Sequence, residues 1–133
     1  MRQQSGGTLK EVKAMNKYHI LICDDEEGVR ESLRAYLEDY YKLSFAKNGG
    51  EAIDSVKSNA FDLVIIDIKM PGIDGLEAIR QIKKVKPAQK IIVLTGYEST
   101  SIAGEASKLG INSYLTKPIG REKLLNTIKD LLK

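Results

Sequence analysis

The apolar run Leu63-Val64-Ile65-Ile66, which ends at Asp67, constrains the fold of this chain more than any other stretch. A run without polar alternation predicts a strand buried on both faces, as in parallel sheets. Pro71-Gly72 then ends the strand region and begins a loop. In open α/β sheets, ligands bind at the carboxyl ends of the strands. A lone aspartate at that position more often caps the next helix, so the surrounding residues decide what Asp67 does.

Four further short stretches predict strands, and each is followed by apolar residues at helical spacing. This strict alternation predicts an α/β domain with a parallel sheet and helices on both faces. We expect a flavodoxin-like (βα)5 fold, a three-layer sandwich with strand order 2-1-3-4-5. The strands are expected at 18–23, 42–46, 61–67, 91–95 and 112–116.

Several local signals set the expected helix boundaries. Asn48-Gly49-Gly50 indicates a turn before the second helix, and helical spacing after the first strand extends to Tyr40. Asp74 is expected to cap the third helix, and Gly110 to follow the fourth in a left-handed conformation. The inner face of the third helix is expected to carry Leu76, Ile79, Ile82 and Val85.

Composition narrows the class of protein. The chain has 133 residues, 42% of them hydrophobic, which suits one domain with a proper core. We read residues 1–16 as a linker or non-native extension and 17–133 as the domain. No stretch has the length of a membrane span, and the single Cys23 fits a cytoplasmic location. The net charge of +3 is mild and unclustered, so we expect no nucleic-acid or membrane partner.

Polar residues follow four of the five expected strands. Because parallel strands end at one edge, and neighbouring strands lie about 4.8 Å apart, Asp25 and Asp67 should share a crevice. With the adjacent Asp24, three carboxylates lie there, and because they repel one another they require protons or a cation. An all-oxygen ligand set favours Mg²⁺, and a carboxylate is a known nucleophile toward phosphorus. The residues concerned are Asp24, Asp25, Asp67, Thr95 and Lys117.

The motifs together resemble the receiver domain of two-component response regulators, over Tyr18 to Lys133. The resemblance implies that Asp67 accepts a phosphoryl group from a histidine of a sensor kinase or phosphotransfer protein. Such a domain is not an enzyme in the ordinary sense, because it catalyses only its own phosphorylation and dephosphorylation. The motifs are Asp24-Asp25, Asp67, Met70-Pro71-Gly72 with Asp74-Gly75, Thr95-Gly96 and Lys117-Pro118.

The same resemblance implies roles for the other residues of the site. Mg²⁺ would be held by Asp25, Asp67 and the main-chain carbonyl of Lys69, with Asp24 acting through water. Thr95 and Lys117 would each bind one phosphoryl oxygen. A cis peptide bond is expected at Lys117-Pro118, although such bonds are uncommon even before proline.

Tyr114 occupies the position of the switching aromatic residue in receiver domains. The resemblance implies that Thr95 moves toward the phosphoryl group and Tyr114 turns into the vacated space. A surface made by the fourth helix, fifth strand and fifth helix would then change its affinity for a downstream effector or relay protein. Without the motif, Tyr114 would simply be an amphipathic strand residue.

Lys69 and Tyr97, two residues after Asp67 and Thr95, differ from the better-known chemotaxis receivers. The pair is similar to that of small phosphorelay intermediates of sporulation pathways. We hypothesise that this bulky, non-acidic rim shields the acyl phosphate and slows its hydrolysis. The alternative is that Lys69 is an ordinary surface lysine.

Three other functions share part of this pattern. A haloacid dehalogenase-type phosphatase also uses a strand-end aspartate, but needs a second acid where this chain has Lys69. A flavin-binding module would need a glycine and hydroxyl loop after the first strand, where this chain has four acids. A phosphate-independent pseudo-receiver would normally have lost the acceptor or the lysine, and Asp67 and Lys117 are both present.

Overall fold

The structure, a computed structural model, describes residues 17–96 and 99–133. Residues 1–16 and Tyr97 therefore lie outside the described part of the chain. Strands and helices alternate throughout that part, as expected. The elements are β1 (His19–Cys23), α2 (Glu27–Leu37), β2 (Lys42–Ala46), α3 (Gly49–Ser58), β3 (Leu63–Ile66), α4 (Gly75–Val85), β4 (Ile91–Thr95), α5 (Thr100–Lys108), β5 (Ser113–Thr116) and α6 (Arg121–Leu132).

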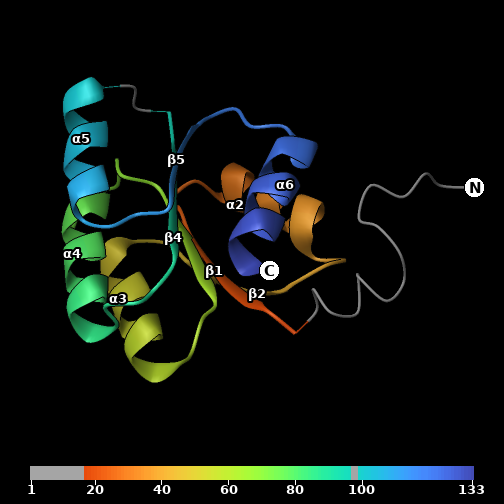
Figure 1. Cartoon of the computed structure of the whole chain (residues 1–133), viewed down its shortest axis with the longest axis horizontal. Coiled ribbons are helices and arrows are strands. Elements are labelled where there is room, and N and C mark those ends of the chain that lie inside the picture. The colour runs from red at the N-terminus through yellow and green to blue at the C-terminus, as the bar shows by residue number, and fades with distance from the viewer. Residues whose placement is uncertain (1–16, 97–98) are drawn as a thin grey trace, which may run out of the picture.

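The five strands form one parallel sheet in the order β2-β1-β3-β4-β5, which confirms the predicted topology. In Figure 1, α3, α4 and α5 cover one face of the sheet, and α2 and α6 cover the other. The ladder between β1 and β3 continues past the strands, because the Asp67 amide donates to the Cys23 carbonyl over 3.1 Å. The Asp24 amide likewise donates to the Ala46 carbonyl. The backbone thus fixes both aspartates at one edge of the sheet.

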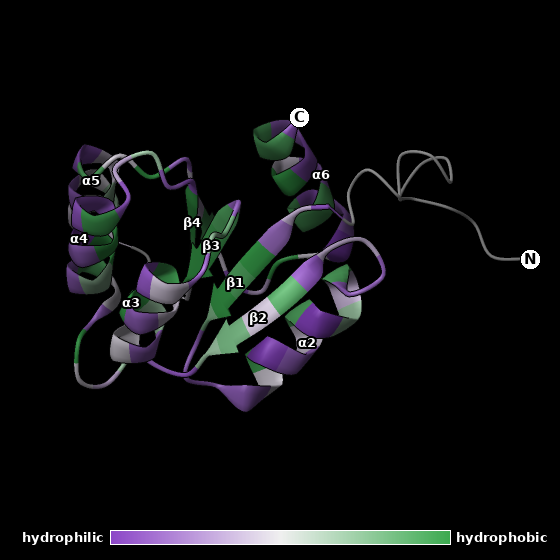
Figure 2. Ribbon diagram, turned by 90° about the horizontal axis from the view of Figure 1, so that it is seen from below, coloured by the Kyte–Doolittle hydropathy of each residue, from purple (hydrophilic) through white to green (hydrophobic). Residues whose placement is uncertain are grey.

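The central strand β3 is buried on both faces. Val64 and Ile66 pack into the core beneath α3, α4 and α5, whereas Leu63 and Ile65 pack toward α2 and α6. All four are at most 2% exposed, which explains why the run shows no polar alternation. Figure 2 shows how burial differs between central and edge strands: β1 is strongly hydrophobic, whereas the edge strand β2 mixes hydrophobic and polar residues. No helix in 17–96 and 99–133 has the length and apolarity to cross a bilayer.

The prediction of a turn at Asn48-Gly49-Gly50 is wrong, because both glycines belong to α3. Asn48 is the N-cap, and its side-chain oxygen accepts from the Glu51 amide over 2.8 Å. The glycine at position 49 has a packing role. A Cβ there would lie 2.7 Å from the Ile73 carbonyl oxygen, so α3 can pack this closely only without a side chain.

The prediction that Val85 lies on the inner face of α4 is also wrong, since Val85 is 39% exposed. Leu76, Ile79 and Ile82 are buried as expected. Steps of three residues fall short of a helical turn by about 60° each. After three such steps from Leu76, Val85 points to the opposite side of the helix.

Two adjacent tyrosines give a stability prediction. Helix α2 ends at Leu37, not at Tyr40, but Tyr40 and Tyr41 are both buried. The Tyr40 hydroxyl is 2.7 Å from an Arg121 nitrogen, whereas the buried Tyr41 hydroxyl has no hydrogen-bond partner among the described residues. Removing an unpaired buried hydroxyl should stabilise the fold. We expect Tyr41→Phe to raise the free energy of unfolding by about 1 kcal/mol.

Tyr40→Phe is the matched control, because the same atom is removed from a hydroxyl that has a partner. It should lower the free energy of unfolding by about 1 kcal/mol. Urea denaturation followed by circular dichroism measures both values. If both substitutions changed the free energy of unfolding in the same direction, this account of the Tyr41 hydroxyl would be contradicted.

Candidate functional site

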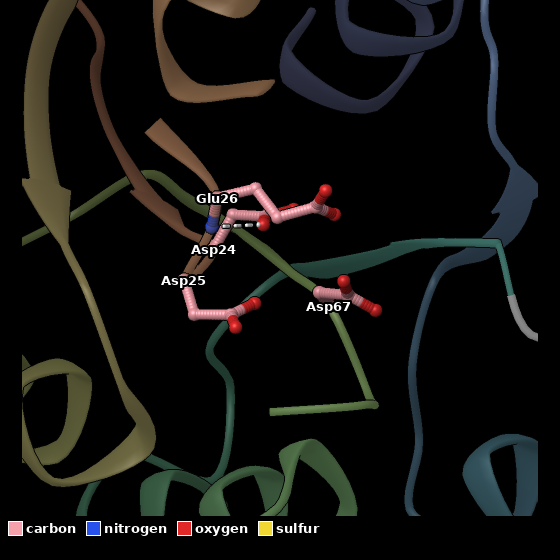
Figure 3. Close-up of side chains that lie close together, drawn as sticks. All are labelled: Asp24, Asp25, Glu26 and Asp67. Atoms are coloured by element: carbon pink, nitrogen blue, oxygen red, sulfur yellow. Dashed lines mark hydrogen bonds between the residues drawn. The ribbon is translucent and has the colours of Figure 1, made fainter. Parts of the chain in front are cut away.

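The structure brings the predicted site residues together at the carboxyl edge of the sheet. Asp24 follows β1, Asp67 follows β3, Thr95 ends β4 and Lys117 follows β5. Asp24, Asp67 and Thr95 are nearly buried, with 3%, 5% and 1% of their surfaces exposed. Asp25 is exposed at the rim. Figure 3 shows the acidic side chains gathered from the ends of β1 and β3.

Lys117 links the acids of the two neighbouring strands. Its ammonium lies 2.8 Å from both Asp24 Oδ2 and Asp67 Oδ2, and 3.3 Å from Glu26 Oε1. Burial alone would lower the pKa of Lys117, but the hydrogen bonds and charges of Asp24 and Asp67 outweigh burial and raise it. Lys117 is therefore a fixed positive charge beside Asp67.

The backbone around Lys117 also ties it to the sheet. The Lys117 amide donates to the Thr95 carbonyl over 2.9 Å. The Lys117-Pro118 peptide bond is cis, which is the isomer that the resemblance implied. The ammonium thus projects from a segment joined to the end of β4.

Four carboxylates lie close enough to bind one cation. Asp24, Asp25, Glu26 and Asp67 each offer an oxygen, and these atoms lie within 4.8 Å of one another. The donor set contains only oxygen, which fits a hard dication such as Mg²⁺. Glu26 was not among the predicted site residues. Its position directly after Asp24-Asp25 was the available signal.

A pocket of about 240 Å³ opens over Asp67 and has room for a phosphoryl group with water around it. The exposed Lys69 side chain reaches this pocket, and the Lys69 amide donates to Asp67 Oδ1 over 3.2 Å. Asp67 is thus held from both sides, by Lys69 through one oxygen and by Lys117 through the other. The pocket is lined by Glu26, Asp67, Lys69, Thr95, Gly96 and Lys117.

The two residues of the expected switch lie on neighbouring strands. Thr95 on β4 lines the pocket, and Tyr114 on β5 is half-buried against the core that lies between the sheet and α5. In the β4–β5 register, Tyr114 is opposite Val93 and Thr116 is opposite Thr95. Tyr97, the second residue of the expected shielding pair, lies outside the described residues.

Asp24 gives a prediction about pH. Burial raises the pKa of its carboxyl, and the hydrogen bonds from Lys117 and the Glu26 amide only partly offset this. The folded state therefore holds this proton more tightly than the unfolded state. Protonated Asp24 makes its full contribution to the free energy of unfolding at pH values below the pKa of the unfolded state, about 4. That contribution is lost as the pH rises through the higher pKa of the folded state.

Asp24→Asn should therefore stabilise the metal-free protein at pH 7, by about 1 kcal/mol, as is common when the buried charge of a functional site is removed. The advantage over wild type should shrink as the pH falls through the raised pKa of Asp24, because the folded wild type then takes up this proton. Urea denaturation with chelator present, at a series of pH values, measures the difference. A variant less stable than wild type at pH 7 would contradict the prediction.

Comparison with known proteins gives a consistent result. Residues 20–129 match the sequence model of the family described as response regulator receiver domain. Among curated proteins, the chain is 39% identical over 115 residues to the response regulator MprA of Mycobacterium sp. (strain KMS). It is 37% identical over 114 residues to the transcriptional regulatory protein ZraR of Klebsiella oxytoca. These alignments cover 86% and 85% of this chain, but only 50% and 26% of the two relatives.

The fold agrees with solved structures. A response regulator receiver domain protein (CheY-like) from Methanospirillum hungatei JF-1 superposes with a TM-score of 0.84 at 32% identity. That superposition covers 86% of this chain and 93% of the other. The chain thus spans nearly all of this solved structure, but at most about half of MprA and ZraR.

Proposed function

The chain belongs to the response regulator receiver domain family, and we propose that Asp67 is its phosphoacceptor. The donor would be a phosphorylated histidine of a sensor kinase or phosphotransfer protein, with Mg²⁺ as cofactor. One observation carries the proposal: the Lys117 ammonium lies 2.8 Å from the carboxylate of Asp67 inside a pocket that Thr95 also lines. Phosphoryl transfer needs such a nucleophile beside fixed positive charge and hydroxyl donors.

The chemistry follows from these residues. A carboxylate oxygen of Asp67 attacks phosphorus and forms an acyl phosphate. The N–P bond of the donor breaks, and the histidine nitrogen keeps the electron pair and becomes neutral when the ring takes a proton from solvent. Lys117 would neutralise the phosphoryl oxygens, and the Thr95 hydroxyl would donate a hydrogen bond to one of them. In the separate hydrolytic step a water oxygen attacks phosphorus, the P–O bond to Asp67 breaks, inorganic phosphate leaves, and the Asp67 carboxylate is restored.

The acidic residues would hold the metal. Asp24, Asp25 and Asp67, with the main-chain carbonyl of Lys69, form the proposed ligand set, and Glu26 lies beside them. When bound, Mg²⁺ supplies charge neutralisation at phosphoryl oxygens. Without a metal ion, the Lys117 ammonium is surrounded by three carboxylates. The net charge of the pocket is then negative, because one positive charge cannot neutralise three negative charges.

Incubation with Mg²⁺ and acetyl phosphate tests the proposal. Intact-mass spectrometry should show a gain of one phosphoryl group that disappears when a chelator replaces Mg²⁺. Failure of the purified protein to gain this mass with either acetyl phosphate or a phosphohistidine donor would overturn the proposal.

The finer roles are also part of the proposal. Thr95 and Tyr114 would switch the surface formed by α5, β5 and α6, and so bias binding of a downstream effector or relay protein. Support comes from their placement, since Thr95 lines the pocket and Tyr114 packs two strand positions away toward α5. We further propose a phosphorelay-intermediate type of receiver that works in the cytoplasm.

Lys69 leads to a prediction about phosphate lifetime. Its exposed side chain lines the pocket mouth, where a water must approach the acyl phosphate. Lys69→Asn should therefore speed phosphate release by about two- to ten-fold, within the range over which positioning near a reacting centre acts. The measurement is release of inorganic phosphate after the donor is removed. Lys57→Asn on α3 is the control, and equal or slower release by Lys69→Asn would refute the shielding role.

A further inference from the structure

We propose that Glu26 is a positioning residue that acts through Lys117. It is the anionic partner that receives the Lys117 ammonium when a divalent cation occupies the space between Asp24 and Asp67. This inference rests on the proposed function, because it assumes that the acidic pocket binds Mg²⁺. It assigns a role to the Glu26 side chain, which is not part of the receiver-domain motifs.

The three carboxylates around Lys117 are not equivalent. The side chains of Asp24 and Asp67 are 4% and 5% exposed, and each is 2.8 Å from the ammonium. The Glu26 side chain is 64% exposed and reaches the same ammonium from outside, at 3.3 Å. Glu26 is therefore the partner on the solvent side of Lys117.

Lys117 and a dication compete for the same oxygens. The ammonium lies against Oδ2 of both Asp24 and Asp67, and these carboxylates are also the proposed metal ligands. Two cations held between the same two acids repel each other strongly. The ammonium must therefore move outward, and the nearest remaining carboxylate is Glu26.

The structure offers space for this movement next to the ion pair of Glu26 and Lys117. A second hollow, of about 330 Å³, lies beside α2, and Glu26 and Lys117 line both this hollow and the pocket over Asp67. The ion pair thus borders both hollows. Every other residue that lines the second hollow is uncharged, including Val29, Tyr36 and Ile119. Without Glu26, an ammonium that moved that way would meet no anion there.

The backbone holds Glu26 in place for this role. Glu26 is the N-cap residue of α2, and its carbonyl accepts from the Arg30 amide over 3.1 Å. Its amide donates to Asp24 Oδ1 over 2.9 Å, the bond drawn in Figure 3. The amide of one residue thus orients a buried ligand, while its side chain pairs with the displaced cation.

Mg²⁺ titration of the metal-free protein tests the inference, with dissociation constants from calorimetry or amide shifts. Glu26→Gln should weaken Mg²⁺ binding by about three- to five-fold, the range of a partly exposed ion pair. Glu27→Gln is the matched control, because it removes the neighbouring charge, for which no bond to Lys117 is seen. It should bind Mg²⁺ like wild type, because exposed charges at longer range are screened by salt.

A double-mutant cycle separates the positioning role from direct attraction of the ion. With Lys117→Met, no ammonium needs a new partner, so Glu26→Gln should cost less affinity than it does in the wild type. Lys117→Gln replaces Lys117→Met if the latter lacks the circular dichroism of the wild type. An equal or larger loss without Lys117 would show that Glu26 attracts the ion itself, and would overturn the inference.

The outcomes also distinguish this inference from the proposed function. If wild type and Glu26→Gln bind Mg²⁺ equally well, the role of Glu26 is overturned and the proposed function is unaffected. Wild type that binds no Mg²⁺ would overturn the proposed cofactor and the inference together.

Discussion

Asp67→Asn is expected to abolish the gain of phosphoryl mass in the presence of Mg²⁺ and acetyl phosphate. The amide oxygen of asparagine is a far weaker nucleophile than a carboxylate, and the side chain can no longer form an acyl phosphate. The loss should be complete, not partial, because the other acids of the pocket are differently placed. Asp24 is not among the described residues that line the pocket over Asp67, whereas Asp67 lines it together with Thr95 and Lys117. Intact-mass spectrometry over a time course measures the result.

Asp74→Asn is the matched control for this experiment. It removes the same charge from the same loop, and the Asp74 side chain accepts from the Glu77 amide as the N-cap of α4. Asparagine caps helices about as well as aspartate, so this variant should fold and gain phosphoryl mass like wild type. Mass gain by Asp67→Asn at the wild-type rate would place the acceptor on another residue.

Gly75→Ala is expected to lower the free energy of unfolding by about 3 kcal/mol, the upper part of the range for overpacking. Gly75 begins α4, and its amide donates to the Ile68 carbonyl over 2.7 Å. A Cβ on Gly75 would penetrate the Asp67 carbonyl oxygen and the Ile68 Cα. Both are backbone atoms at the exit of β3, so neither can rotate away. The start of α4 must move, and the segment that presents Asp67 must move with it.

Gly104→Ala provides the contrast. Gly104 lies in α5, and a Cβ there would meet no described atom within 4 Å. The free energy of unfolding should rise by about 1 kcal/mol, because alanine has a higher helix propensity than glycine. Urea denaturation of both variants gives the two free energies. A Gly75→Ala protein as stable as Gly104→Ala would contradict the close approach of α4 to the Asp67 backbone.

The strand pattern predicted the fold because burial on both faces leaves a direct trace in the sequence. The ranges of β2 and β4 agree with the prediction residue for residue, and the order of the strands is also confirmed. Asp74 as the N-cap of α4 and Gly110 with φ 86° are confirmed too. The N-cap and the left-handed glycine depend on local backbone chemistry, which single residues specify.

Two features that depend on contacts between distant segments, at Gly49 and Glu26, were not predicted, and one residue was assigned to the wrong face of a helix. Gly49 looked like a turn residue, but its role comes from the approach of Ile73, which lies in another loop. Val85 looked buried because a three-residue step approximates a helical turn only over a short stretch. Glu26 is one of four consecutive acids after the first strand, and the sequence does not single it out. Only the position of Lys117, more than ninety residues later in the chain, gives it a partner.

The acceptor itself can be identified by one measurement. Borohydride reduces an acyl phosphate on aspartate to homoserine, which marks the phosphorylated position in a peptide map. After treatment with Mg²⁺ and acetyl phosphate, homoserine should appear at position 67 and be lost when the magnesium is chelated. Homoserine at position 24 or 25, or at none, would contradict the account in which Lys117 and the neighbouring acids prepare Asp67 to attack phosphorus.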